Sequence, residues 1–180
     1  YRYNNVPMDR GGRYIYVRDN VSEDMWSASW QPILKDTSKY KYECRHGLGY
    51  TKISSEYSGI RTNTLYFVPL GESLEVWMFE IKNEGKKVRS LTVNTFVEFC
   101  LWDALNDMTD YQYNLNIGET LYKDNTIYHI SRYRVENKYY AFLTCSNTKA
   151  NSFDSDRTSY LGPYGSFESP LAVRHGKGSN

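Results

Sequence analysis

Residues 91–103 read LTVNTFVEFCLWD, and this stretch decides the kind of fold that the chain adopts. Its side chains alternate, so that Leu91 and Val93 would lie on one face of a strand and Phe96 on the other. Alternation with a period of two predicts a β-strand packed against a core. The strand is expected to end near Trp102, where polar and aromatic residues become dense.

Residues 102–115 read WDALNDMTDYQYNL and gather aromatic rings beside amide and carboxylate groups. Flat aromatic faces next to such polar groups suit a sugar, which offers an apolar C–H face and a ring of hydroxyls. A long loop anchored by buried aromatic rings would have the same composition. Around the start of the stretch, Leu101, Leu105 and Met108 have the spacing of a short helical turn. Composition alone leaves the sugar-binding loop and the anchored loop as alternatives.

The rest of the chain repeats the strand pattern between turn signals. It contains 18 Tyr, four Trp and seven Phe, and such aromatic residues favour pleated surfaces. The expected strands cover residues 13–17, 50–57, 62–68, 73–82, 88–99, 126–134 and 139–146. No segment has a capped helical period sustained over three turns. The chain is therefore predicted to be all-β, with an antiparallel β-sandwich as its natural architecture.

Three segments carry more specific expectations. Residues 73–82 have apolar side chains on both faces, which predicts a central strand covered on both sides. Residues 83–87, NEGKK, are expected to form a hairpin connection to the next strand. From Ser152 onward, Ser, Gly and Pro become dense, which is typical of long surface connections.

Charge and chain length exclude several classes of protein. A chain of 180 residues can bury a substantial core, and a net charge of +1 gives no reason to expect nucleic acid or an acidic membrane surface. No apolar run approaches the roughly 20 residues that span a bilayer. The chain begins with Tyr1 rather than Met and has no signal-peptide pattern at its start, so we expect a piece of a longer protein.

The candidate metal ligands and thiols do not form recognisable sites. Cys44, Cys100 and Cys145 are odd in number and far apart, which predicts free, partly buried thiols in a reducing, cytoplasmic compartment. The three histidines are too scattered to indicate a metal site. Residues 154–156, DSD, are spaced like calcium ligands but lack the later glutamate, so a turn with Arg157 pairing locally is expected instead.

A family resemblance adds to these inferences. Residues 96–103, together with Tyr111, Gln112 and residues 114–115, resemble the inverting disaccharide phosphorylases of glycoside hydrolase family 94, of which cellobiose phosphorylase is the best known. Other segments agree with the family and follow its order: YRYNN (1–5), GGRY (11–14), WQP (30–32), RHGLGY (45–50), FVPLGE (67–72), FDSDR (153–157) and LG (161–162). No single segment is a strong motif, whereas the ordered set, which covers nearly the whole chain, is specific.

The resemblance implies a fold, a domain order and a reaction. Residues 1–180 would be most of an N-terminal β-sandwich domain, a partial supersandwich of the galactose-mutarotase-like type. A helical (α/α)6 barrel with the catalytic acid and the phosphate site would follow downstream, so no catalytic residue and no metal site is expected in this segment, which should be inactive alone. The reaction would convert a disaccharide and inorganic phosphate, the co-substrate, into α-glucose 1-phosphate and free sugar, without a cofactor.

The resemblance also assigns a role to the loop after the decisive strand. In the family, the N-terminal domain builds a homodimer and this loop reaches the partner subunit's active site, where its counterparts here, Asp110, Tyr111, Gln112 and Tyr113, would hold the acceptor sugar. Cellobiose-specific members usually carry arginine at the position of Tyr113. Tyrosine offers one hydroxyl and a stacking face in place of five fixed donors, which leaves a laminaribiose-type or related specificity open.

Two alternatives from other classes remain open. A self-contained carbohydrate-binding β-sandwich module should bind glucan alone and fold independently. A fragment of a phosphorylase should bind glycans weakly or not at all in isolation, and its open strand edges should make it prone to aggregation. A purely structural domain would tolerate substitution of Gln112 and Tyr113 without loss of acceptor affinity.

Overall fold

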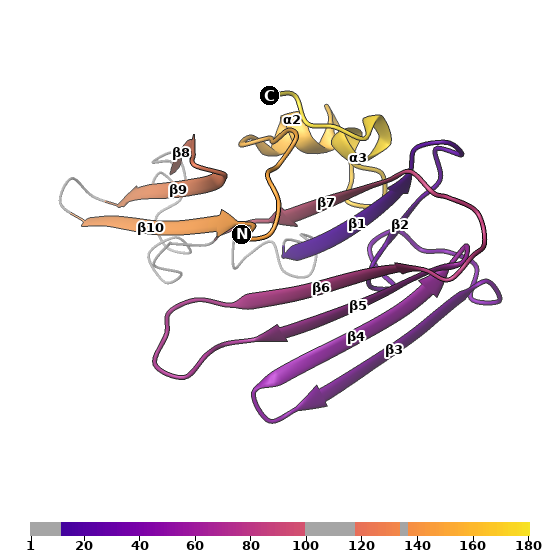
Figure 1. Ribbon diagram of the computed structural model, residues 1–180. Coiled ribbons are helices and arrows are strands. Elements are labelled where there is room, and N and C mark those ends of the chain that lie inside the picture. Colours follow the sequence, from indigo (N-terminus) through magenta and orange to yellow (C-terminus); the bar gives the residue numbers. More distant parts are fainter. Residues whose placement is uncertain (1–11, 100–117, 134–136) are drawn as a thin grey trace.

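The computed structural model describes residues 12–99, 118–133 and 137–180. In these residues every strand pairing is antiparallel, and the strands form three sheets in the orders β2-β1-β7, β3-β4-β5-β6 and β10-β9-β8 (Figure 1). The strands are β1 (Arg13–Asp19), β2 (Met25–Ser27), β3 (Tyr40–Gly47), β4 (Tyr50–Tyr57), β5 (Ile60–Phe67), β6 (Val76–Asn83), β7 (Leu91–Val97), β8 (Gly118–Lys123), β9 (Thr126–Tyr133) and β10 (Asn137–Thr144). The predicted all-β, antiparallel fold is confirmed.

The decisive stretch forms β7, which pairs with β1 along its whole length, from Leu91 opposite Asp19 to Val97 opposite Arg13. The predicted alternation is present in β7, where Phe96 is buried and Val93 is 40% exposed on the other face. β1 and β7 are therefore neighbours in the sheet, although about 70 residues separate them in the sequence.

The β2-β1-β7 sheet is covered on both faces, because successive residues of β1 point to opposite sides. Tyr16 enters one core cluster with Phe96 and with residues from the end of the chain. Val17 enters a second cluster that contains Trp26, Tyr40 and Ile60. Figure 1 shows the resulting layers, with two short helices over one face of this sheet and the β3–β6 sheet across the other.

Residues 73–82 do not form the covered central strand that the sequence predicts. Their strand, β6, pairs only with β5 and ends the order of the four-stranded sheet in the described residues. Met78 is 58% exposed and Ile81 is 38% exposed. The apolar pattern was misleading because, of the residues of β6, Phe79 is the one that packs against the second cluster.

The connection at residues 83–87 is likewise not a hairpin, because β6 and β7 belong to different sheets. Asn83 Nδ2 donates to the Lys87 carbonyl at 2.7 Å, which holds the crossing segment in place. The physical reason for the crossover is burial: Leu91 at the start of β7 packs against the cluster between the two sheets. A local turn pattern does not contain this information.

The end of the chain is more than the surface connection predicted from Ser152 onward. It forms two helices, α2 (Arg157–Leu161) and α3 (Leu171–His175), which pack against each other and over β1. Tyr160, Leu161 and Val173 are buried in the first core cluster. Each helix has five residues, which is too short to show a helical period in the sequence.

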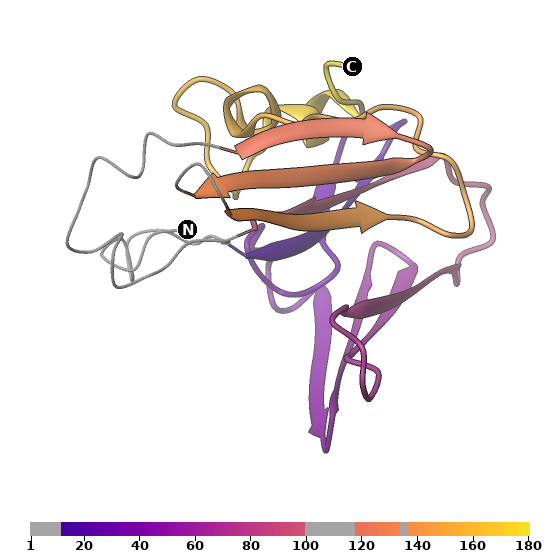
Figure 2. The same cartoon turned by 90° about the vertical axis from the view of Figure 1, so that its left-hand side faces the viewer.

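The third sheet consists of β8, β9 and β10, and Figure 2 shows it face-on, with the β3–β6 sheet extending below it. β9 and β10 correspond to the strands expected at residues 126–134 and 139–146, and they pair over eight residue pairs. Tyr122 of β8 stacks on Phe153 with ring centroids 4.1 Å apart, which connects this sheet to the segment that leads into α2.

Candidate functional site

The residues that the sequence assigns to the acceptor sugar lie outside the described residues. They are Asp110, Tyr111, Gln112 and Tyr113, and the short helical turn expected at residues 102–108 also lies outside them. The structure describes the strand that leads to this segment. β7 ends at Val97, directly opposite Arg13 of β1.

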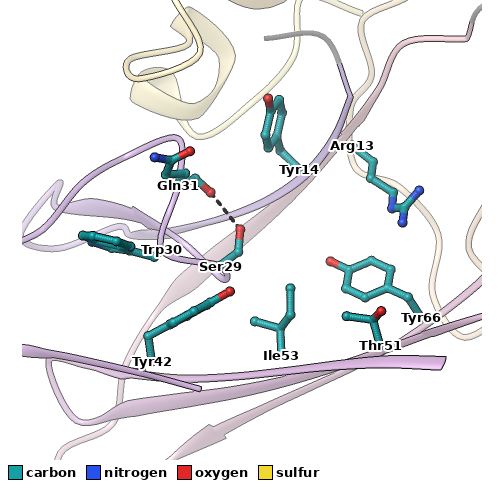
Figure 3. A pocket seen from close by; sticks show the side chains of 9 residues that line it. All are labelled: Arg13, Tyr14, Ser29, Trp30, Gln31, Tyr42, Thr51, Ile53 and Tyr66. Carbon is teal, nitrogen blue, oxygen red and sulfur yellow. Dashed lines mark hydrogen bonds between the residues drawn. The ribbon is translucent and has the colours of Figure 1, made fainter. Parts of the chain in front are cut away.

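An aromatic crevice opens beside this same end of β1, with a volume of about 320 Å³ (Figure 3). Its floor is Tyr42, Thr51, Ile53 and Tyr66 of the β3–β6 sheet. Its walls are Arg13 and Tyr14 of β1 together with Ser29, Trp30 and Gln31, which follow β2. We call these nine residues the aromatic crevice.

The floor side chains meet because they share one face of the sheet. Thr51 pairs with Tyr66 and also lies opposite His46, two positions beyond the pair of Ile53 with Cys44. Residues two apart in a strand point to the same side, so Tyr42 of β3 lies on this face as well. The opposite face of the sheet is charged, with Glu56 between Lys41 and Arg61 at 3.0 Å from each.

One end of the crevice, at Arg13, is held in a fixed arrangement. The Arg13 guanidinium lies over the Tyr66 ring at 5.2 Å and forms an ion pair with Glu75 at 2.9 Å. Tyr66 in turn makes an edge-on contact with Trp77 at 5.9 Å between ring centroids. Burial raises the pKa of Tyr66, so its hydroxyl remains protonated at neutral pH.

The other end is formed by a short loop that is anchored on both sides. Ala28 and Pro32, which flank residues 29–31, are buried, and the Ala28 N–H donates to the Ile15 carbonyl at 2.8 Å. Ser29 Oγ donates to the Gln31 carbonyl at 2.7 Å, as Figure 3 shows. Trp30 is 41% exposed and Tyr42 is 42% exposed, so part of each ring surface is open to solvent.

Sequence reasoning did not identify this crevice. Residues 30–32 entered the family resemblance, but Tyr42 was not singled out because residues 40–47 were not recognised as a strand. The usable signal was the alternation YKYECRH, which places Tyr40, Tyr42, Cys44 and His46 on one face. Gathering Trp30, Tyr42 and Tyr66 required knowledge of which strands pair.

The other candidates from the sequence do not assemble into a site. His46 is exposed, with Nδ1 3.0 Å from Thr51 Oγ1 and Nε2 3.5 Å from Cys44 Sγ. His129 is half-buried in β9, and burial lowers its pKa. Within the described parts of the chain, no group of three or more His, Cys, Asp or Glu side chains could hold a metal ion. Cys44 and Cys145 are free, as predicted, but only Cys44 is partly buried, because Cys145 is exposed; Cys100 lies outside the described residues.

The local pairing expected for Arg157 is wrong. Arg157 Nε lies 2.7 Å from Glu98 Oε1, immediately after β7, and its guanidinium lies 5.2 Å from the centre of the Phe167 ring. Asp156 instead caps α2 by accepting a hydrogen bond from the Ser159 N–H at 2.7 Å. The ion pair joins the start of α2 to the end of the decisive strand.

The helices in the described ranges are too short and too polar for any of them to cross a bilayer. The aromatic crevice lies beside the point where the chain leaves β7. Its lining of exposed rings and uncharged polar groups can bind a small neutral molecule.

Comparison with known proteins gives a consistent result. The family described as "Glycosyl hydrolase 94, supersandwich domain" matches residues 1–180. The chain is 36% identical over 176 residues to an N,N'-diacetylchitobiose phosphorylase from Vibrio proteolyticus, covering 98% of this chain. It is 28% identical over 172 residues to a solabiose phosphorylase from Paenibacillus borealis, covering 94% of this chain. In both cases it spans 22% of the relative's length.

Proposed function

The chain belongs to the supersandwich-domain family of glycosyl hydrolase 94, and from this premise we propose that it is part of an inverting disaccharide phosphorylase. The observation that carries the proposal is the family match over all 180 residues. The relatives named above are disaccharide phosphorylases in which a segment like this one makes up about a fifth of the protein. The catalytic acid and the phosphate site would belong to a further, helical domain of the same protein.

The proposed reaction breaks one bond and forms one. The glycosidic C–O bond breaks and a carboxylic acid gives its proton to the leaving oxygen. An oxygen of inorganic phosphate attacks the anomeric carbon from the opposite face and forms the new C–O bond. A β-glucosyl disaccharide thus yields α-glucose 1-phosphate and a free sugar. Phosphate is the nucleophile, so no second carboxylate and no cofactor is needed.

We propose that this segment contributes to the acceptor side of the site. Asp110, Tyr111, Gln112 and Tyr113 follow β7 and would hold the leaving sugar across a homodimer. The proposal is supported by the strand, which is present as predicted and is fixed along β1 by seven residue pairs. A strand of this rigidity is a suitable base for a specificity loop.

The relatives bear on which disaccharides are candidate substrates. Cellobiose and laminaribiose are the candidates from the resemblance, whereas two relatives above 30% identity, both from Vibrio, are N,N'-diacetylchitobiose phosphorylases. We therefore place N,N'-diacetylchitobiose beside cellobiose and laminaribiose as candidate substrates. A cytoplasmic location is consistent with the free Cys44 and Cys145, because reducing compartments keep thiols unpaired.

The test is a phosphorolysis assay of the complete protein with each disaccharide, with and without inorganic phosphate. Phosphate-dependent release of a sugar 1-phosphate is the expected result, and its absence with every disaccharide would refute the proposal. In the same assay, Tyr113→Arg should change the ratio of kcat/KM values between cellobiose and laminaribiose by about tenfold, since one directional hydrogen bond to a charged donor contributes about 1.5 kcal/mol. An unchanged ratio would remove Tyr113 from the acceptor site.

A non-catalytic carbohydrate-binding module is the second candidate function. The aromatic crevice is the observation that favours it, because exposed rings beside uncharged polar groups suit a sugar. The two candidates separate on whether the complete protein consumes phosphate. Both candidate functions are compatible with a sugar bound at the aromatic crevice.

A further inference from the structure

We propose that the aromatic crevice binds a single pyranose ring of a neutral saccharide, with Trp30 and Tyr42 against its C–H faces and Gln31 against its hydroxyls. The inference goes beyond the proposed phosphorylase function, which assigns sugar contacts to Asp110 and to residues 111–113 and none to the crevice. Its choice of a sugar among neutral ligands rests on the proposed function. It also departs from the expectation that this segment has little affinity for glycans.

The two exposed rings give the crevice its shape. Trp30 and Tyr42 come from different elements and are each about two-fifths exposed. In Figure 3 they lie on the same side of the crevice, with the Trp30 ring above the Tyr42 ring. The aromatic contacts between described residues include none that joins these two rings, so their faces are not consumed by stacking on each other.

The polar groups at the rim suit hydroxyls. Gln31 is exposed, and only its backbone carbonyl has a hydrogen-bond partner among the described residues, the Ser29 hydroxyl. An amide side chain presents two donors and an acceptor. A hydroxyl group both donates and accepts, so a sugar can use all of these positions at once.

The charge of the crevice favours a neutral ligand over a phosphorylated one. Arg13 is the one cation among its lining residues, and its guanidinium is already paired with Glu75. Phosphate recognition needs an unpaired cation or several converging donors. A sugar phosphate would therefore gain little here over the free sugar.

The crevice is formed before a ligand arrives. Arg13, Tyr66 and Trp77 fix one end of it, while the buried Ala28 and Pro32 fix the loop at the other end. A ligand therefore does not have to order this surface, which is the main cost in binding at flexible loops. The 320 Å³ volume lies at the small end of the range of about 300–1,000 Å³ for small-molecule sites.

Aromatic grooves also accept proline-rich peptides, which lie extended along several rings. Arg13, whose side chain is about half-exposed, and Tyr66 bound the aromatic crevice at one end. A crevice of about 320 Å³ that is bounded in this way favours a compact ring over an extended chain, so we commit to the saccharide and make the peptide an outcome of the test.

The experiment labels the complete protein with fluorotryptophan and follows the Trp30 fluorine resonance, assigned by its loss in Trp30→Phe. Cellobiose and N,N'-diacetylchitobiose are titrated separately in phosphate-free buffer, so that no phosphorolysis occurs. We expect a saturable shift of the Trp30 signal with at least one disaccharide. Tyr42→Ala should raise the Kd read from that signal by about tenfold, the loss of one aromatic stacking face.

Tyr50→Ala is the matched control. Tyr50 is 47% exposed, but its position in β4 places it on the opposite, charged face of the same sheet. It should leave the Kd within about twofold, as is usual for a surface residue away from a site. The inference is overturned if the Trp30 resonance shifts with neither disaccharide, or if it shifts only with a polyproline peptide. It is also overturned if Tyr42→Ala leaves the Kd for the disaccharide unchanged. The phosphorolysis assay is independent of this signal, so failure of the enzymatic proposal is recognised separately.

Discussion

At the scale of single residues, buried polar groups hold the central sheet together. Asp19, at the end of β1, is 4% exposed and accepts hydrogen bonds from the Val21 N–H at 2.8 Å and the Ser22 N–H at 3.1 Å. Arg89 donates to it from the segment before β7 and also reaches the Ser58 carbonyl at 2.8 Å. One carboxylate therefore ties the first strand to a turn of the neighbouring sheet.

Asp19→Asn tests this arrangement. The pKa of Asp19 lies below its ordinary value of 3.8. The hydrogen bond from the Ser22 N–H lowers it most, whereas burial acts in the opposite direction. The Val21 N–H and Arg89 lower it further. A lowered folded-state pKa stabilises the fold above the unfolded pKa, and this stabilisation is lost as the pH falls from 3.8 through the folded value. Asp19→Asn should cost about 1–3 kcal/mol at pH 7 and progressively less below pH 4.

The measurement is hydrogen exchange of peptides that cover β1, at pH 7 and at pH 3. Glu72→Gln is the control, because Glu72 is exposed and lies in the turn before β6. A difference between Asp19→Asn and the wild type that is as large at pH 3 as at pH 7 would contradict the assigned role of the charge.

Tyr16→Phe isolates a single buried hydroxyl. Tyr16 is fully buried and donates to the Phe167 carbonyl at 3.2 Å. Removing the hydroxyl leaves that carbonyl unpaired and should lower the free energy of unfolding by about 1 kcal/mol. Hydrogen exchange in β1 and in the segment around Phe167 measures the effect. Equal protection in the variant would mean that the hydrogen bond contributes nothing.

At the scale of elements, the two five-residue helices are held by burial rather than by helix propensity. Val173 of α3 is fully buried against β1 and lies in the cluster with Phe96 and Tyr160. The tight connection before α3 depends on Gly165, where an added Cβ would lie 1.9 Å from the Leu161 carbonyl oxygen. Close approach of the chain to itself therefore fixes where the second helix lies.

Val173→Ala is expected to destabilise the cover of the central sheet by about 2 kcal/mol, through lost apolar burial and the cavity that remains. Val88→Ala is its matched control, because Val88 is 98% exposed and should tolerate the same deletion. Hydrogen exchange of β1 and β7 reports both variants. Equal effects of the two substitutions would show that α3 does not cover the sheet in solution.

Gly165→Ala should be more disruptive, because the obstacle to the new methyl group is backbone that cannot rotate away. We expect loss of at least about 2 kcal/mol and exposure of Tyr160 and Phe167 to exchange. Gly71→Ala is the comparison: Gly71 has a φ of 81°, but an added Cβ there meets nothing within 4 Å. It should show only the cost of the strained backbone, about 1 kcal/mol.

Prediction from the sequence succeeded where local pattern was enough. The strand at residues 50–57 was predicted with the bounds of β4, and the alternation of residues 91–97 was read correctly. It failed for β2, β3 and β8, and for α2 and α3, because these elements are short or carry polar residues on exposed faces. Partner choice is the second limit: nothing near Leu91 indicates that it lies opposite Asp19. The aromatic crevice depends on such pairings, and so it could not be anticipated.

At the scale of the whole molecule, the described sheets leave apolar surface uncovered. Leu121 and Phe142 are each about half exposed, and Tyr140 is 62% exposed. Leu121 and Phe142 lie opposite the same residue of β9, Tyr128, so they share one face of the β8–β10 sheet. Exposed apolar faces of this kind promote association in solution.

We expect residues 1–180, expressed alone, to self-associate and to lack phosphorylase activity. Phe142→Lys should reduce the association, since a charge on the exposed face opposes apolar contact. Tyr50→Lys, an aromatic residue of similar exposure on the charged face of the other sheet, should not. Light scattering over a range of concentrations measures both. If residues 1–180 are monomeric at all concentrations, or if the two variants reduce the association equally, the assignment of this apolar face to self-association is contradicted.

The long reach from Tyr16 to Phe167 has a consequence for biosynthesis. The two residues are 151 positions apart, and Arg18 bonds the Arg174 carbonyl across 156 positions. At 5–20 residues per second, roughly 8–30 s pass between emergence of the first strand from the ribosome and arrival of its cover. During that interval one face of the strand is apolar and exposed to solvent. Nascent chains paused before Leu171 should therefore bind ribosome-associated chaperones preferentially.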